Sequence, residues 1–336
     1  MTANFYRDFE DKYRGSRELI KDRLQVYLPF VLPLAALHPG LPALDLGCGR
    51  GEWLELLQDN CIPAQGVDLD NNMLAACAER GLSVCNADAI DYLKTQPNAS
   101  YLVVTGFHIA EHLPFDVLQT LFAQTRRVLV PGGLLILETP NPENIVVGTA
   151  SFYIDPTHQR PLPSQLLTFM AEHEGFGPVN LLRLQEAPAL ATQAHVCLYD
   201  VLAGASPDYA IVAQMPAQAS HPQSQALVQA LESAFAASQG ISLYTLATRF
   251  ENQSQAQHQQ ARQDAQQAHL TASQAHLKAE QAHLKAEQAL ALALQLGNRA
   301  EQLAAQLNAV YASRAWRLTK PLRWLSKLFR GGSGQG

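Results

Sequence analysis

The sequence predicts an α/β fold built on a parallel sheet, followed by a long helical extension. Short β-rich runs alternate with amphipathic stretches from residue 42 onward, which is the pattern of strands joined by helical crossovers. After residue 217 the composition shifts to Gln, Ala, His and Leu, and a seven-residue unit repeats almost verbatim between residues 267 and 287. These observations divide the chain into a globular domain, residues 41–217, and an extended helical part.

Length and charge fit an enzyme with a separate basic end. The 336 residues are enough to bury a real hydrophobic core. The net charge is −6, but without the six basic residues from Arg314 to Arg330 it is −12, with 18 basic residues against 30 acidic ones. An acidic body argues against nucleic acid as the main partner, whereas the basic end indicates an anionic one.

Cysteine usage and hydropathy indicate the compartment. The five cysteines include no CxxC pair, so a disulfide framework or zinc ribbon is not indicated. No stretch approaches the roughly 20 apolar residues of a membrane span. We therefore expect a cytoplasmic protein without a transmembrane helix.

Six strands are predicted in the globular domain. They are Pro42–Leu46, Ala64–Asp68, Ser83–Asn86, Tyr101–Thr105, Leu134–Glu138 and Asp208–Met215. Gly132 and Gly133, after Pro131, are expected to turn the preceding helix into the fifth strand. A more irregular segment is expected before the last strand.

The first strand runs into a glycine-rich turn with the sequence DLGCGRGE. Gly47 and Gly49 allow the backbone to approach a ligand closely. A nucleotide-binding dehydrogenase is the competing interpretation, but Glu52 stands where the third glycine of GxGxxG would fall. Asp45 and Glu52 place carboxylates where a pyrophosphate needs amides and positive charge. A cationic ligand fits better, namely the ammonium group of S-adenosylmethionine.

Two further acids end the next two strands. Asp68 follows Asp45 by 23 residues, where it can accept hydrogen bonds from both ribose hydroxyls. Asp88 ends the third strand, where it can accept from the adenine amino group. Each acid alone could be a loop acid or a helix cap, but together they predict the cofactor site. Ala89 and Phe107 are expected to be further cofactor contacts.

The motifs DLGCGRG, GVD, ADA and LVPGGLLILETPN resemble those of class I S-adenosylmethionine-dependent methyltransferases over roughly residues 1–217. This resemblance implies a Rossmann-like seven-stranded sheet, S-adenosylmethionine as cofactor, and an acceptor that enters over the C-terminal ends of the strands. It does not identify the acceptor.

Two other segments resemble methyltransferases of bacterial surface-polysaccharide synthesis, including O-antigen chain-terminating enzymes. One runs from Phe5 to Arg23, within a helical lid expected over residues 1–40. The resemblance implies that this lid closes over the cofactor and that Arg23 pairs with the methionine carboxylate. The alternative is that Arg23 is a surface residue of an ordinary helix.

The other segment is the loop Phe152–Pro163, with the sequence FYIDPTHQRPLP. It gathers Asp, His, Tyr and Arg side chains at the expected substrate edge, which is typical of acid–base and sugar-binding equipment. We expect His158 to act as the general base and Asp155 to orient it. The structural alternative is that Asp155 caps a turn and His158 bonds to the backbone.

A third constellation, His108-Ile109-Ala110-Glu111-His112, matches the inverted zinc-protease signature, which the methyltransferase frame argues against. It also resembles an ExxEH segment that holds a divalent metal in ubiquinone-pathway O-methyltransferases. His108 replaces the first glutamate, so metal ligation by His108, Glu111 and His112 stays open. Without metal, His108 and Glu111 should border the pocket, and Glu111 is a second candidate for the base.

Residues 218–252 are predicted to be a helical linker and residues 253–310 a coiled coil that makes a homo-oligomer. The alternative is a single solvated helix. The predicted seam has Ala272, Ala279, Ala286, Ala293, Ala300 and Leu307 at one core position, and Ala275, Ala282, Ala289, Leu296, Leu303 and Val310 at the other.

Residues 311–330, YASRAWRLTKPLRWLSKLFR, predict a basic amphipathic helix interrupted at Pro321, which would lie on the anionic inner face of the cytoplasmic membrane. The alternative is a helix that docks on the protein's own acidic body. A similar SRxWRxTxPLR stretch ends many surface-polysaccharide glycosyltransferases and related enzymes. We therefore expect glycosyltransferases of the same pathway as partners.

Together these features predict an O-methyltransferase acting on a sugar hydroxyl of a lipid-linked surface polysaccharide of the O-antigen type, at the chain end. One alternative is a small-molecule, quinone-type O-methyltransferase, which gives no account of the repeat helix and basic tail. The other is a non-enzymatic scaffold for glycosyltransferases. The intact Asp45, Asp68 and Asp88 argue against the scaffold.

Overall fold

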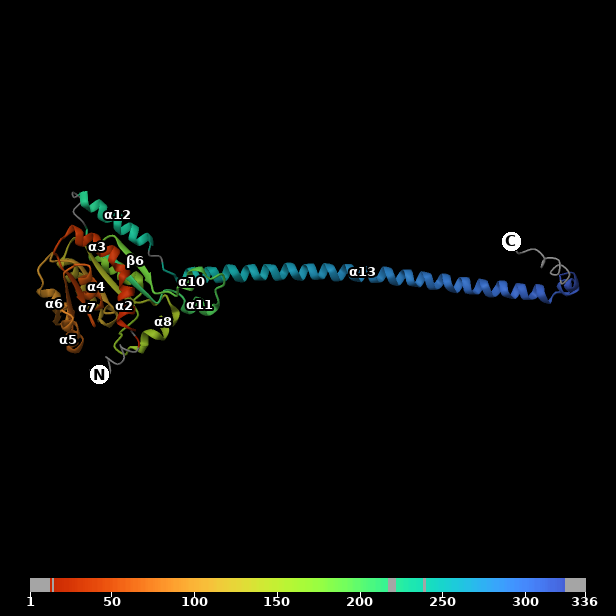
Figure 1. Ribbon diagram of the computed structural model, residues 1–336, viewed down its shortest axis with the longest axis horizontal. Helices are drawn as coiled ribbons and strands as arrows, with labels where there is room; N and C mark the ends of the chain where they lie inside the picture. The colour runs from red at the N-terminus through yellow and green to blue at the C-terminus, as the bar shows by residue number, and fades with distance from the viewer. Residues whose placement is uncertain (1–12, 14, 217–221, 238–239, 324–336) are drawn as a thin grey trace, which may run out of the picture. The chain divides into compact units, whose positions relative to one another are not determined.

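The computed structural model describes residues 13, 15–216, 222–237 and 240–323 (Figure 1). The chain divides into two compact units, residues 1–255 and 256–336. The segment Phe5–Glu10 and Arg14, which contribute to the predicted lid, lie outside the described residues, as do Trp324 to Arg330 of the predicted tail.

The first unit contains the predicted α/β fold, with a seven-stranded sheet in the order β3-β2-β1-β4-β5-β7-β6. Strands β1 to β5 are parallel, and β7 lies antiparallel between β5 and β6. The strands are β1 (Ala43–Leu46), β2 (Ala64–Asp68), β3 (Val84–Asn86), β4 (Tyr101–Phe107), β5 (Leu129–Pro140), β6 (Val179–Leu184) and β7 (Asp208–Gln214).

Two details of the sheet differ from the prediction. Strand β5 begins at Leu129, so Pro131 to Gly133 lie inside the strand, where the register against β4 shifts between Tyr101 and Val103. The glycines therefore form an irregularity within β5 and do not start it. Strand β6 falls in the segment expected to be irregular, and it is an edge strand paired with β7 alone.

Helices cover both faces of the sheet because successive strand residues point to opposite sides. On β5, Leu135 and Leu137 pack in one apolar cluster, and Leu134 and Ile136 pack in another. The first cluster includes residues of α6 (Ala89–Thr95), α7 (Phe115–Val128) and α9 (Ser164–His173). The second includes residues of α2 (Arg17–Leu24), α3 (Leu28–Leu37), α4 (Glu52–Asp59) and α12 (Pro222–Ala237). The other helices of this unit are α5 (Asn71–Glu79), α8 (Ile145–Thr149), α10 (Pro188–Thr192) and α11 (Leu198–Ala203).

The segment 218–252, predicted to be a linker, is helical in α12 and at the start of α13, but it belongs to the first unit. The rings of Phe235 on α12 and Phe30 on α3 lie 4.7 Å apart, and Leu231 is 4% exposed. α12 completes the apolar layer over α3, and the compact unit extends to Gln255 because Leu246 and Phe250 at the start of α13 pack with Leu190 and Val196.

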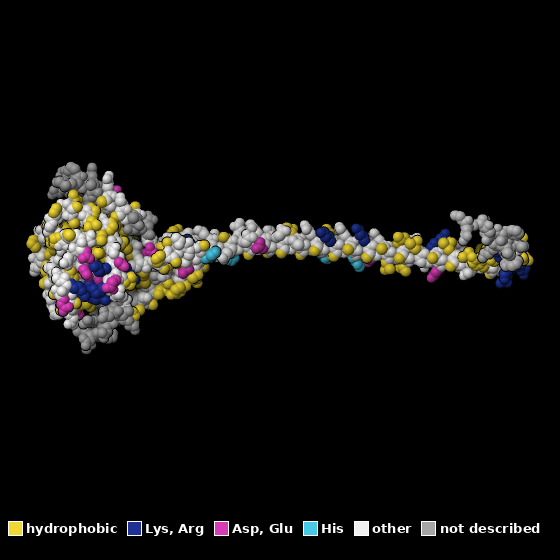
Figure 2. Space-filling view, viewed as in Figure 1, with side chains coloured by type: hydrophobic (Ala, Val, Ile, Leu, Met, Phe, Trp, Pro, Cys, Tyr) yellow, Lys and Arg dark blue, Asp and Glu magenta, His cyan; other side chains and the backbone are white. Residues whose placement is uncertain are grey.

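The predicted long helix is α13 (Leu243–Ala312), 70 residues in length. Its side chains are exposed from residue 256 to residue 312, among them Leu296 and Leu303 of the predicted seam, and Figure 2 shows apolar side chains on its surface. The coiled coil itself stays a prediction. A break at Ser313, which caps α14 (Arg314–Leu318), precedes the interruption expected at Pro321. Within the described residues, no helix combines the length and apolar composition needed to cross a membrane.

Candidate active site

The glycine-rich turn after β1 has a backbone conformation that favours glycine. The φ angles are +68° at Gly47, +50° at Gly49 and +78° at Gly51, all in the left-handed region. A Cβ atom at Gly47 would lie 3.2 Å from the Ile109 side chain, and one at Gly51 would lie 2.8 Å from Cys77 Sγ. The turn therefore exposes backbone at the C-terminal edge of the sheet and leaves no room for larger residues.

Asp68 holds this turn through its carboxylate, and Asp45 is held by β4. The Oδ2 atom of Asp68 accepts a hydrogen bond from the Gly49 amide at 2.8 Å, and its Oδ1 accepts from the Asp70 amide at 2.8 Å. Asp45 is buried and accepts from Thr105 Oγ1 at 2.7 Å. Asp88 caps α6, accepting from the backbone amides of its first turn, so the helix-cap alternative holds for this residue.

Two adjoining cavities open at this edge of the sheet. One, of about 470 Å³, is lined by Arg23, Asp45 and Phe107, and by His108, Asp155 and His158 from the acceptor side. The other, of about 320 Å³, is lined by residues after β2 and β3 together with the glycine turn. All eight predicted cofactor residues line one cavity or the other: Arg23, Asp45, Gly47, Gly49, Asp68, Asp88, Ala89 and Phe107.

Ion pairs tie the N-terminal helix α2 to α4 beside the glycine turn. Arg17 Nη2 lies 2.6 Å from Glu55 Oε2, and Lys21 Nζ lies 3.1 Å from Asp59 Oδ2. Glu52, the first residue of α4, pairs with Arg50 at 2.9 Å. These contacts hold α2, one of the described helices of the predicted lid, against α4 beside the glycine turn.

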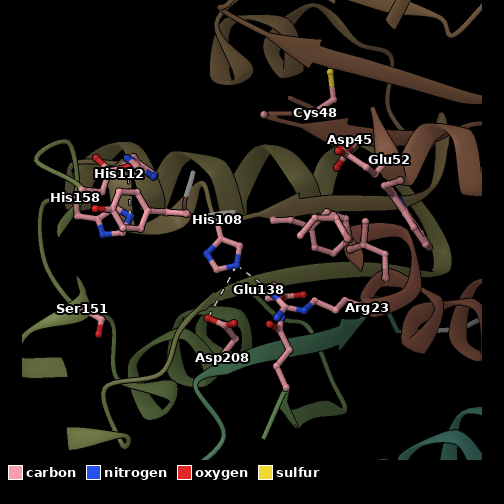
Figure 3. Close-up of a pocket in the computed structure, with 18 of the residues that line it drawn as sticks. Arg23, Asp45, Cys48, Glu52, His108, His112, Glu138, Ser151, His158 and Asp208 are labelled. Atoms are coloured by element: carbon pink, nitrogen blue, oxygen red, sulfur yellow. Dashed lines mark hydrogen bonds and ion pairs between the residues drawn. The ribbon is translucent and has the colours of Figure 1, made fainter. Parts of the chain in front are cut away.

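His108 stands at the centre of a group of carboxylates (Figure 3). Its Nδ1 lies 3.1 Å from Glu111 Oε1. On the other side of the ring, Nε2 lies 3.6 Å from Glu138 Oε1 and 4.0 Å from Asp208 Oδ1. Glu138 and Asp208 were not among the predicted site residues. The feature of the sequence that could have identified them is their position, since each stands at one end of a predicted strand.

The carboxylates set the charge on His108. Burial alone lowers the pKa of His108, but hydrogen bonds to Glu111 and Glu138 and the nearby Asp208 raise it well above its ordinary value. Burial raises the pKa of Glu111, yet its bond to His108 brings that pKa below the usual range. Burial, together with the charges of Glu138 and Glu111, raises the pKa of Asp208 to about 7. These carboxylates therefore favour the protonated form of the His108 ring, which makes His108 a poor candidate for the base.

His158 lies in the same cavity, and its ring is held by the backbone. Its Nδ1 lies 2.6 Å from the Phe152 carbonyl oxygen, so Nδ1 carries the proton and Nε2 keeps a lone pair. Asp155 Oδ2 is 4.0 Å from Nε2, while Asp155 Oδ1 accepts from the amide and hydroxyl of Thr157 at 2.8 and 2.6 Å. The expectation that Asp155 orients His158 is therefore wrong, because Asp155 caps a turn and the carbonyl holds the ring.

The predicted metal trio does not converge on one point. His108 directs Nδ1 at Glu111 and presents Nε2 to the opposite side, away from His112. The described residues instead form two sets whose ligand atoms lie within 4.8 Å of one another. They are Glu111, His112 and His158, and His108, Glu138 and Asp208. The structure therefore does not support a single ion bound by His108, Glu111 and His112 together.

Comparisons with known proteins give a consistent assignment. The family model described as "Methyltransferase domain" matches residues 43–133. A solved S-adenosylmethionine-dependent methyltransferase from Archaeoglobus fulgidus is 32% identical, with a TM-score of 0.56, over 62% of this chain and 99% of that one.

Two curated relatives also match part of the chain. A probable S-adenosylmethionine-dependent methyltransferase from Mycolicibacterium smegmatis is 31% identical, over 45% of this chain and 58% of its own length. A trans-aconitate 2-methyltransferase from Sinorhizobium fredii is 35% identical, over 31% of this chain and 40% of its own length. The chain thus spans about half the length of these curated relatives.

Proposed function

We propose that this chain, which belongs to the S-adenosylmethionine-dependent methyltransferases, methylates a hydroxyl oxygen of a bacterial surface polysaccharide of the O-antigen type, at the end of the glycan chain. The observation that carries O-methylation is His158, a tautomerically fixed histidine whose Nε2 lone pair borders the cavity next to the glycine turn.

The residues of the two cavities fit S-adenosylmethionine, which supplies an electrophilic methyl group on a sulfonium sulfur. Gly47 and Gly49 line the cavities without side chains of their own, so a ligand can lie against their backbone. Asp68 has a lone pair left on each oxygen for the ribose hydroxyls, and Asp45 and Glu52 give the methionine end a negative wall. Arg23 lines the same cavity and would hold the methionine carboxylate.

His158 is positioned to take the acceptor's proton. As the bond between the acceptor oxygen and the methyl carbon forms and the methyl–sulfur bond breaks, the hydroxyl proton passes to Nε2 of His158. The Phe152 carbonyl then stabilises the resulting imidazolium through Nδ1. Glu111 is the weaker candidate because its lowered pKa and its bonds to His108 and Thr139 leave it little basicity.

A glycan acceptor is supported by the loop around His158 and by the C-terminal extension. The loop presents Tyr153, 59% exposed, and Arg160, whose guanidinium lies 4.8 Å from the centre of the Phe115 ring. Apolar ring faces beside hydrogen-bonding groups suit the amphipathic surface of a sugar.

We further propose that the helix α13 assembles copies of the chain. The basic tail would keep the protein on the inner face of the cytoplasmic membrane, where glycosyltransferases of the pathway build lipid-linked glycans.

A small-molecule acceptor is the second candidate, and the relative whose name gives trans-aconitate as its substrate favours it. Such an acceptor needs neither α13 nor the tail. A third candidate, a scaffold that binds glycosyltransferases without catalysis, leaves the geometry of Asp45, Asp68 and the glycine turn without a purpose.

A transfer assay with methyl-labelled S-adenosylmethionine separates these candidates. The full chain is incubated in parallel with lipid-linked glycan, with trans-aconitate and with a quinol. Label in the glycan alone supports the proposal. Label in trans-aconitate or the quinol alone supports the small-molecule candidate, and cofactor binding without transfer to any acceptor supports the scaffold.

A further inference from the structure

We infer that His108, Glu138 and Asp208 form a divalent-cation site, of a kind suited to Mn²⁺, on the acceptor side of the cofactor cavity. The three side chains come from the end of β4, the end of β5 and the start of β7. Because β7 is inserted antiparallel beside β5, its first residue lies at the same edge of the sheet as the last residues of β4 and β5.

The ligand atoms are close enough to share one ion. His108 Nε2, Glu138 Oε1 and Asp208 Oδ1 all lie within 4.8 Å of one another, and Nε2 is 3.6 and 4.0 Å from the two carboxylate oxygens. An ion with ligand bonds of about 2.1 Å would contact all three after side-chain shifts of about 1 Å or less. In Figure 3 both carboxylates face the same edge of the His108 ring.

The ligands are held from behind in the way that metal ligands require. His108 Nδ1 bonds to the buried Glu111, and this carboxylate also accepts from Thr139 Oγ1 at 2.9 Å. A carboxylate bonded to the far nitrogen of an imidazole fixes the ring and leaves the near nitrogen for an ion. Glu138 is held as well, because its Oε2 accepts from the Tyr27 hydroxyl and its Oε1 accepts from Gln185 Nε2 at 2.9 Å, which leaves Oε1 a second lone pair for an ion.

The charge around His108 also calls for a cation. Glu111, Glu138 and Asp208 bring three carboxylates to one imidazole, and Arg23 is a further cation whose charge acts on Asp208. A dication would displace the proton from Nε2 to solvent and balance the two carboxylates there, while Glu111 keeps its bond to Nδ1. One nitrogen and two oxygens, with positions open toward the cavity, suit Mn²⁺ better than an ion that prefers sulfur ligands.

The neighbouring set, Glu111, His112 and His158, is less suited. It offers one carboxylate where the His108 set offers two, and that carboxylate, Glu111, already holds His108 Nδ1. An ion at the His108 site would have open coordination positions on the cavity side, where an acceptor oxygen can bind. The binding of an acceptor oxygen to the ion rests on the proposed function, whereas the binding of the ion itself does not.

The test is Mn²⁺ titration of the full chain after treatment with a chelator, without cofactor or acceptor, followed by electron paramagnetic resonance. We expect one bound Mn²⁺ per chain and a loss of affinity of about tenfold or more in both Glu138→Gln and Asp208→Asn. The matched control is His112→Gln, a member of the other set, which should bind Mn²⁺ as the wild type does. Thermal unfolding identifies any variant that has lost its fold. If one of the two carboxylate variants does not fold, the other still tests the site.

No bound Mn²⁺ in the wild type would overturn the inference, and so would equal binding in the wild type and both carboxylate variants. Loss of binding in His112→Gln with retention in Asp208→Asn would assign the ion to the other set. Because these readings require no methyl transfer, failure of the metal site and failure of the proposed glycan activity remain distinguishable.

Discussion

At the scale of single residues, the loop around His158 shows how backbone groups take over a role expected of a side chain. The sequence pattern paired Asp155 with His158, three residues apart. In the structure, Asp155 accepts hydrogen bonds from the Thr157 amide and hydroxyl. The His158 ring is hydrogen-bonded to the Phe152 carbonyl. A backbone carbonyl cannot be recognised in a sequence, so residue types alone could not predict this partner.

His158→Ala should therefore lower turnover by about 10²- to 10⁴-fold, the usual contribution of a general base, with little effect on cofactor affinity. Asp155→Asn should keep most of the activity because the ring remains held at Nδ1. Single-turnover rates and calorimetry of cofactor binding measure the two quantities. Equal losses in the two variants would show that Asp155, and not the carbonyl, controls the ring.

Asp68 has two duties in the structure, since it also holds the amides of Gly49 and Asp70. Asp68→Ala should abolish detectable cofactor binding, because each lost hydrogen bond costs about 1 kcal/mol and the glycine turn loses its support. Asp88→Ala, which removes a helix cap and the proposed adenine contact, should weaken binding less. Calorimetry gives the affinities and circular dichroism checks the fold. Unchanged affinity in Asp68→Ala would remove the basis for the cofactor site.

At the scale of elements, α12 is a helix whose packing could not be predicted from its amino-acid composition. The change to Gln and Ala after residue 217 predicted a linker, but Leu231 and Phe235 pack against the apolar layer on α3. Leu231→Ala should lower the free energy of unfolding of the catalytic unit by about 2–5 kcal/mol, as for other buried leucines. Denaturant titration followed by tryptophan fluorescence measures this, with the exposed neighbour change Glu232→Ala as control. Equal stability in both variants would make α12 a linker after all.

The sheet explains what could and could not be predicted about the site. Asp45, Asp68 and Asp88 each follow a parallel strand, and parallel strands end at one edge, so sequence order alone brings them together. Glu138 and Asp208 meet because β7 is inserted antiparallel between β5 and β6. That order depends on long-range pairing with β6, an edge strand without a clear alternating pattern, so strand propensity could not reveal it.

At the scale of the whole molecule, the chain joins a globular unit to a helix whose side chains are exposed from residue 256 to residue 312. Beyond the end of α13, the Arg323 guanidinium lies 3.5 Å from the centre of the Trp316 ring, which also packs on Tyr311 at 4.9 Å between ring centres. Aromatic rings beside arginines suit a headgroup layer, to which each basic residue adds about 1 kcal/mol near an anionic surface.

A chain that ends at Ala309 should bind S-adenosylmethionine normally but no longer sediment with anionic liposomes. Binding by the full chain should weaken as salt rises, since surface attraction is screened within about 10 Å at 0.1 M salt. Liposome binding that survives truncation would show that the tail is not the part of the chain that binds the membrane. Lost cofactor binding would instead indicate that the tail docks on the catalytic unit.

The most direct test of the central claim is mass and linkage analysis of the surface glycan from cells with and without this protein. Deletion should remove an O-methyl group from the glycan chain end, and the wild-type gene, but not the His158→Ala variant, should restore it. An identical glycan in the presence and absence of the protein would contradict the account and leave a small-molecule acceptor as the stronger candidate.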